Sequence, residues 1–224
     1  MGFEKDSFAY FRHMHVKAAS IQNLTDARYF ASHSVEWMGF CFDPASKSFI
    51  SPREAQQIIA WVEGPRILGE FGAQSLKEIQ ETAMILGLNG VQIDAEGLSE
   101  SIDLQQLAVI VKVKLHENDR LEEVKALLGQ YSGPLEYILL DLTAHFGTWN
   151  SFLSESKLGL TGLKQLAAEF PLMLATWFDK DNILSIIDKV NPAAIQLSGS
   201  AEQKTGEKLF DGLEEVFSSI EVRN

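Results

Sequence analysis

This 224-residue sequence has few of the features that are typical of disulfide-bonded, membrane-spanning or secreted proteins. Its single cysteine, Cys41, has no partner for an internal disulfide, which is typical of proteins kept in a reducing compartment. No apolar run reaches the ~18 residues of a membrane span, and residues 1–13 lack the apolar stretch of a signal peptide. We therefore expect a cytoplasmic protein with no membrane partner.

Positive charge is also scarce. The chain has 19 lysines and arginines against 31 aspartates and glutamates, and its net charge of -12 is spread over the whole length. Such a surface repels a phosphate backbone, so nucleic acid is not expected as a partner. A small phosphorylated ligand is still compatible with this charge, because backbone N–H groups at helix N-termini bind anions without any lysine.

The sequence does contain a regular alternation of short apolar runs with longer segments of helical period, which is typical of βαβ units and a parallel sheet. Strands are predicted at His15–Ala19, Trp37–Phe42, Ile67–Phe71, Gly90–Ile93, Val109–Leu115, Tyr137–Asp141, Leu172–Ala175 and Ala194–Leu197. Helices are predicted near Thr25–Ser32, Pro52–Val62, Leu76–Leu86, Leu104–Leu107, Leu121–Leu128, Leu160–Glu169, Asp181–Val190 and Glu207–Ser218. Eight of each predict an α/β protein, a (β/α)8 TIM barrel at residues 14–224 after an N-terminal extension at 1–13; an open doubly wound sheet is the alternative.

Helix boundaries carry their own signals. Ser51-Pro52 is typical of an N-cap followed by proline at the first helical position, and Ser75 with Glu78 forms the pattern of a capping box. Gly87 and Gly129 stand where helices commonly end.

The first strand and turn, Val16-Lys17-Ala18-Ala19-Ser20-Ile21-Gln22-Asn23-Leu24-Thr25-Asp26-Ala27, resemble the opening of the phosphoribosylanthranilate isomerase family. That family reads Lys-Ile-Cys-Gly-Leu-Thr-Asn-x-Glu-Asp-Ala there. Framework matches follow in register at Gly39-Phe40, Gly90-Val91-Gln92 and Leu139-Leu140-Asp141. The resemblance implies a (β/α)8 barrel and an Amadori isomerase of tryptophan biosynthesis. It also places the family's general base, a cysteine, on Ala19, whose methyl group cannot accept a proton.

The resemblance implies further site residues. The family's general acid falls on Asp141, although an aspartate that ends a strand can simply cap the next loop. A family histidine is replaced by Asp94, which is either an exposed loop residue or, if it shares a cavity with Asp141, part of a coupled acid–base pair. Cys41 is a candidate displaced base, or a small buried hydrophobic residue. His116 and His145 are weaker candidates.

Groups that hold the substrate in the family are also changed. Ser48 stands in for the arginine that binds the substrate carboxylate, and Gln92 belongs to the matching fourth strand. The phosphate-binding turns read Ala175-Thr176-Trp177 and Ser198-Gly199-Ser200, so that a tryptophan replaces a glycine and anion binding should be weak. The aromatic residues Phe146, Trp149, Trp177 and Phe178 are expected to close the mouth of the barrel.

These substitutions lead to a main hypothesis with two alternatives. The main hypothesis is a divergent barrel that has lost the family reaction and serves as a small-molecule-binding or regulatory module. The first alternative is an active isomerase with a substitute base, namely Cys41, Asp94 or a histidine. The second is an enzyme with new acid–base chemistry at Asp94 and Asp141. His13 and His15 do not complete a zinc site, so no metal or other cofactor is expected, and the partner is a small or phosphorylated ligand bound by a monomer or homodimer.

Overall fold

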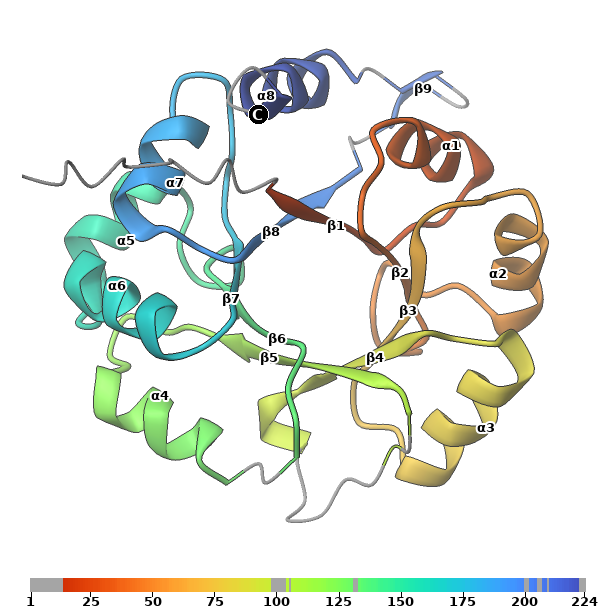
Figure 1. The fold of residues 1–224 in the computed structure, drawn as a ribbon, viewed down its shortest axis with the longest axis horizontal. Coiled ribbons are helices and arrows are strands. Elements are labelled where there is room, and N and C mark those ends of the chain that lie inside the picture. The colour runs from red at the N-terminus through yellow and green to blue at the C-terminus, as the bar shows by residue number, and fades with distance from the viewer. Residues whose placement is uncertain are drawn as a thin grey trace, which may run out of the picture.

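The computed structural model of the protein describes residues 14–97, 104, 106–130, 133–199, 202–204, 207–208 and 210–221. Within these residues eight parallel strands close into a barrel, with helices around its outside (Figure 1). The barrel confirms the predicted fold, and its closure rules out the open sheet. The predicted extension at residues 1–13 lies outside the described residues.

The barrel strands agree with the predicted ones to within one residue at either end. They are β1 (His15–Ala19), β2 (Trp37–Cys41), β3 (Arg66–Phe71), β4 (Gly90–Asp94), β5 (Ala108–Lys114), β6 (Tyr137–Asp141), β7 (Leu172–Ala175) and β8 (Ala194–Ser198). Each pairs with the next in order, and β8 returns to β1 over five residue pairs, from His15 with Ala194 to Ala19 with Ser198.

The helices are α1 (Leu24–Ser32), α2 (Pro52–Ile59), α3 (Leu76–Leu86), the 3-10 helix η1 (Ala95–Gly97), α4 (Leu121–Leu128), α5 (Trp149–Glu155), α6 (Gly159–Glu169), α7 (Ile183–Val190) and α8 (Asp211–Glu221). The helix predictions need several corrections: α2 ends at Ile59 and not at Val62, and α5 was not predicted. The residues described between 104 and 107 are not helical, and Gln106 takes a φ of 71° that a helix does not allow. The last helix begins at Asp211, because Glu207–Lys208 forms β10, which pairs with β9 (Glu202–Lys204). Among the residues described, no helix is long and apolar enough to cross a lipid bilayer.

Predicted caps fix several helix ends. Ser51 and Ser75 each form a capping box with the glutamate three residues later. Gly87 ends α3 with a φ of 62°, the left-handed conformation that favours glycine. Gly129 also follows a helix, α4, but with a right-handed φ of −67°.

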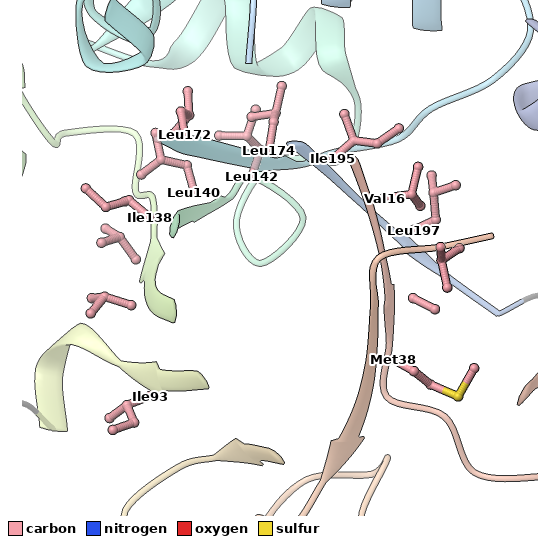
Figure 2. Packing of buried hydrophobic residues seen from close by; sticks show 14 of the residues in the cluster. Val16, Met38, Ile93, Ile138, Leu140, Leu142, Leu172, Leu174, Ile195 and Leu197 are labelled. Carbon is pink, nitrogen blue, oxygen red and sulfur yellow. The ribbon is translucent and has the colours of Figure 1, made fainter. Parts of the chain in front are cut away.

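Two apolar cores lie on the two faces of the strands. The outer core fills the space between barrel and helices, and Figure 2 shows part of it, including Val16, Leu140 and Ile195. The inner core, which we call the apolar floor, consists of Trp37, Leu68, Ile110, Tyr137, Leu139, Met173, Ala175 and Ala194. Because side chains alternate along a strand, neighbours of the outward-facing residues point into the barrel.

Candidate active site

Polar side chains occupy the barrel interior beside the apolar floor. Lys17, Glu70, Gln92 and Asp141 are all buried, and they come from β1, β3, β4 and β6. The strand register places Lys17 beside Gln196 of β8 and Glu70 beside Gln92. Catalytic groups of such barrels are found at the carboxyl ends of the strands, so this is the candidate site.

Lys17 is at the centre of this group. Its side chain is fully buried, and its Nζ donates to Gln196 Oε1 at 2.7 Å and to Gln92 Oε1, and lies 2.8 Å from Glu70 Oε1. We call these four residues the Lys17 cluster. Burial lowers the pKa of Lys17 and outweighs the opposing effect of Glu70. Three acceptors for three donor positions mean that the buried ammonium is fully hydrogen-bonded.

Glu70 connects this cluster to the turn after β1. Its Oε1 accepts the Ser20 amide N–H at 3.2 Å, and its Oε2 accepts the Ser20 hydroxyl at 2.7 Å. Ser20 has a φ of 52°, which explains why the family pattern has glycine there. Burial alone would raise the pKa of Glu70, but Lys17 and Ser20 together lower it. The carboxylate is therefore ionised at neutral pH, and it contacts Ser20, the residue that follows Ala19.

Asp141 has a cation of its own. Its Oδ2 lies 2.9 Å from Lys112 Nζ, and its Oδ1 accepts the Thr143 hydroxyl at 2.6 Å and the Thr143 N–H at 2.9 Å. Burial alone would raise the pKa of Asp141, but Lys112 and Thr143 outweigh burial and lower it. At Lys112, burial lowers the pKa of the ammonium group, but the neighbouring Asp141 carboxylate outweighs burial and the pKa is raised. The loop-capping role and the ion pair therefore coexist at Asp141.

The partner of Asp94 is a lysine and not Asp141, with which the sequence hypothesis paired it. Its Oδ2 lies 2.5 Å from Lys114 Nζ, and in the strand register Asp94 stands beside Lys112 while Lys114 stands beside Asp141. Each carboxylate thus has its own ammonium partner from β5. The structure therefore gives no support to a proton shared between Asp94 and Asp141.

A cavity of about 190 Å³ opens beside these ion pairs. Its lining is mostly charged and includes Asp94, Lys112, Lys114, His116, Asp119 and Glu123. The His116 ring lies 3.7 Å from the ring of His145, and its Nδ1 lies 3.5 Å from Asp119. The two histidines thus contact each other at the edge of this cavity.

Cys41 and Ser48 come from β2 and the loop that follows it. Cys41 is buried, and burial raises the pKa of its thiol. It stands beside Glu70 in the strand register. Ser48 is half-buried, and its backbone N–H donates to Ser46 Oγ at 3.1 Å. The position of the family's arginine thus takes part in a hydrogen bond within the loop.

The turns after β7 and β8 hold the remaining predicted residues. Thr176 is buried, and its hydroxyl has no hydrogen-bond partner within the described part of the chain. Trp177 is half-buried against the outer core. Ser198 is exposed and Gly199 half-buried, whereas Ser200 lies outside the described residues. The Thr176 hydroxyl is thus a buried polar group that forms no hydrogen bond within the described residues.

The predicted aromatic closure is only partly right. Phe146 and Trp149 are buried as expected, but they pack against Phe152 of α5, with ring centroids 5.4 Å and 5.3 Å away. All three rings belong to the outer core, together with the partly buried Trp177 and Phe178. The expectation of a small apolar cavity above Ala19 is wrong, because Ser20 and Glu70 make that region polar.

Sequence reasoning missed Glu70 and Lys112. Glu70 is the single charged residue of the apolar run Ile67–Phe71, and Lys112 is one of two lysines in the run Val109–Leu115. A charge at such a position is rare unless it is paired, so each was a detectable signal. The partner of each charge was not detectable from the sequence. Lys17, for example, lies 53 positions before Glu70.

With this geometry in place, the chain can be compared with known proteins. A family model described as N-(5'-phosphoribosyl)anthranilate (PRA) isomerase matches residues 16–218. The chain belongs to this family. Relatives with that isomerase name include those of Pelobacter propionicus, 30% identical over 86% of this chain and 88% of its own length, and Trichormus variabilis, 26% identical over 94% and 100%.

Solved PRA isomerases have the same fold. The enzyme from Thermotoga maritima is 26% identical, covers 93% of this chain and 99% of its own, and has a TM-score of 0.72. Another structure, 24% identical with a TM-score of 0.67, is of a PRA isomerase in complex with reduced 1-(o-carboxyphenylamino)-1-deoxyribulose 5-phosphate. A further one describes monomers derived from the dimeric Thermotoga maritima isomerase.

These relatives correct the function predicted from the sequence. The main hypothesis, a barrel without the family reaction that serves as a binding or regulatory module, is contradicted by relatives 26–30% identical over at least 86% of the chain, all named as PRA isomerases. They favour the first alternative, an active isomerase with a substitute base. The hypothesis considered the groups lost at Ala19 and Ser48 but not the buried carboxylate and ammonium groups of Glu70 and Lys112.

Proposed function

We propose that this protein isomerises N-(5'-phosphoribosyl)anthranilate in tryptophan biosynthesis. The observation that carries the proposal is Asp141, which ends β6 at the position of the family's general acid and contacts Lys112 at 2.9 Å. The reaction needs an acid that protonates the furanose oxygen and a base that removes the proton from the neighbouring carbon. A cytoplasmic location fits such an enzyme and stays a prediction.

An acid must carry a proton, whereas Lys112 keeps the Asp141 carboxylate ionised in the free protein. We infer that an anionic group of the substrate engages Lys112. Lys112 then stabilises the carboxylate less, so the pKa of Asp141 rises and the residue can take up the proton that it later donates. The cavity beside this pair, with Lys112 and Lys114 in its wall, offers two ammonium groups to such an anion.

Phosphate binding rests on fewer contacts. The Thr176 hydroxyl and the backbone of Gly199 follow β7 and β8, where barrels of this class commonly bind phosphate. We propose that the Gly199 backbone contacts the substrate phosphate, and that the Thr176 hydroxyl, which is buried in the free protein, joins it after rotation of its side chain. Since Trp177 replaces a glycine of the family's turn, we expect a higher KM than for a glycine-containing turn.

Turnover of phosphoribosylanthranilate by the purified full chain, followed by chromatography of the product, tests the proposal. We expect product formation, and complementation of a tryptophan auxotroph that lacks this isomerase. Asp141→Asn should reduce kcat by about 10²–10⁴-fold, since the amide has the same shape but cannot donate the proton. Lys77→Gln, at a side chain 83% exposed on α3, is the control and should leave turnover unchanged. Absence of turnover by the wild-type protein would contradict the proposed function.

A further inference from the structure

We propose that Glu70 is the general base of this isomerase and replaces the cysteine that the family has at the position of Ala19. The inference rests on the proposed function, because it assigns the second proton-transfer group of the same reaction. It concerns a residue of β3, whereas the family's base belongs to β1.

Position is the first support for Glu70. The Ser20 amide that donates to Glu70 Oε1 at 3.2 Å is the peptide group joining Ala19 to Ser20. A Cβ built on Gly39 of β2 would come within 2.1 Å of the same carboxylate oxygen. The carboxylate thus occupies the space between the end of β1 and β2, next to the residue that lacks the family thiol.

The surroundings of the carboxylate are the second support. Glu70 keeps 7% of its side-chain surface exposed, whereas Lys17 keeps none. Lys17 and Ser20 hold the group ionised at neutral pH. Oε2 accepts the Ser20 hydroxyl within the described residues, and a carboxylate oxygen has two lone pairs. Glu70 Oε2 can therefore take up a further proton while Oε1 keeps its contact with Lys17, although the carboxyl group is then neutral.

Other candidate bases are less suitable. Burial raises the pKa of the Cys41 thiol, which leaves it protonated at neutral pH. Asp94 is engaged by Lys114 at 2.5 Å. His116 and His145 follow β5 and β6, the strands of Lys112 and the proposed acid Asp141, and not β1, which ends at Ala19. Glu70 combines an ionised oxygen, a buried cation and a position next to Ala19.

Three proton transfers follow the opening of the sugar ring. After ring opening, carbon 1 of the substrate is joined to nitrogen as an iminium. Glu70 Oε2 takes the proton from carbon 2, and the electron pair of that C–H bond forms a double bond between carbons 1 and 2. The electrons of the iminium double bond move to nitrogen, which gives a neutral enaminol. The Glu70 carboxylic acid then returns its proton to carbon 1, while the hydroxyl at carbon 2 loses its proton to water and becomes the ketone.

The decisive experiment compares Glu70→Gln with the double variant Ala19→Cys/Glu70→Gln in the full chain. We expect Glu70→Gln to lower kcat by about 10²–10⁴-fold, and the double variant to recover at least about tenfold, because the new thiol restores a base at the family's position. A purely structural role of Glu70 predicts no rescue by a thiol. Cys41→Ser is the matched control and should change kcat by less than about threefold.

Ser20→Ala supplies a second readout. Ser20 helps to lower the pKa of Glu70, so its removal should move the acidic limb of the kcat/KM profile to higher pH. If Glu70→Gln fails to fold, Glu70→Asp serves in its place, because it keeps the charge beside Lys17 while withdrawing the carboxylate by one methylene; kcat should fall and the thiol at position 19 should restore it.

The outcomes separate the two proposals. An inactive wild-type protein overturns the proposed isomerase function. An active wild type with a folded Glu70→Gln variant whose kcat is within about threefold of it overturns the role of Glu70 alone. Loss of kcat without rescue by the Ala19→Cys change also overturns it, and assigns Glu70 to the structural pairing of Lys17.

Discussion

Gly39 leaves the space that the Glu70 carboxylate occupies. A methyl group on Gly39 would lie 2.1 Å from Glu70 Oε1 and 3.2 Å from Lys17 Cε. The clashing oxygen is the far end of a flexible side chain, so it can move, but only by giving up part of its contact with Lys17 or Ser20. The absence of a side chain at this position thus sets the position of the proposed base.

Gly39→Ala should therefore lower kcat at least about tenfold while destabilising the fold by about 1 kcal/mol, which is the lower end of the cost of overpacking. The measurements are steady-state turnover and urea unfolding. Gly212→Ala in α8, where an added Cβ meets nothing within 4 Å, is the matched control. It should leave turnover unchanged and stabilise the fold by about 0.5–1 kcal/mol. Unchanged turnover in Gly39→Ala would show that the position of Glu70 is not critical.

At the scale of single elements, the capping box of α3 stabilises a helix that contributes no residue to the site described above. Ser75 accepts the Glu78 N–H, and Glu78 accepts both the N–H and the hydroxyl of Ser75. The Ser75 hydroxyl thus satisfies one of the free N–H groups in the first turn of this helix.

Ser75→Ala should lower the free energy of unfolding by about 0.5–2 kcal/mol, the usual cost of losing such a cap. Because α3 lies outside the barrel, kcat and KM should stay as in the wild type. Ser154→Ala, whose exposed hydroxyl donates to backbone carbonyls within α5, is the control and should change stability by less than about 0.5 kcal/mol. A large effect on turnover from Ser75→Ala would indicate that α3 is coupled to the site.

Strands were easier to predict than the loops after them. A barrel strand is buried on both faces, so that it reads as a short apolar run such as Leu172–Ala175, and the turn chemistry of Ser51 and Ser75 marks helix starts directly. The segment at Leu104–Leu107 has too few residues for helical periodicity to be meaningful, and Gln106 takes a left-handed backbone conformation. Local pattern therefore located the barrel strands and most of the helices, but not α5, β9, β10 or the irregular connection between β4 and β5.

The candidate site was predictable only where one residue could be aligned with the family, as at Asp141. The ion pairs of Lys17 with Glu70 and of Lys112 with Asp141 join different strands, and their formation depends on the register in which the barrel closes. That register follows from packing of the whole sheet. A sequence in isolation therefore reveals the loss of a thiol more readily than the gain of a buried carboxylate.

For the whole molecule, the two buried carboxylates predict how stability depends on pH. The pKa values of Glu70 and Asp141 are lowered from ordinary values of 4.5 and 3.8. A lowered carboxyl pKa contributes stability that is fully present above the ordinary value and is lost as the pH falls through the lower, folded value. The unfolded chain binds more protons in that range, so acid favours unfolding.

Urea unfolding at about pH 7 and about pH 3 should show a lower free energy of unfolding in acid. Asp141→Asn should show a smaller difference between the two pH values than the wild type, because one of the titrating groups is gone. Lys77→Gln, which alters an exposed pair 3.8 Å apart, is the control and should keep the wild-type difference. An equal pH dependence in wild type and Asp141→Asn would mean that this carboxylate does not contribute.

A ribosome releases β1 long before it releases β8. Until residues 194–198 have been synthesised, β1 lacks one of its two neighbouring strands, and Lys17 lacks the Gln196 oxygen that lies 2.7 Å away in the finished protein. An unpaired apolar strand edge is prone to aggregation. Nascent chains that stop before β8 should therefore depend on chaperones, and neither the barrel nor the proposed base can reach its final arrangement before nearly nine-tenths of the 224 residues have been translated.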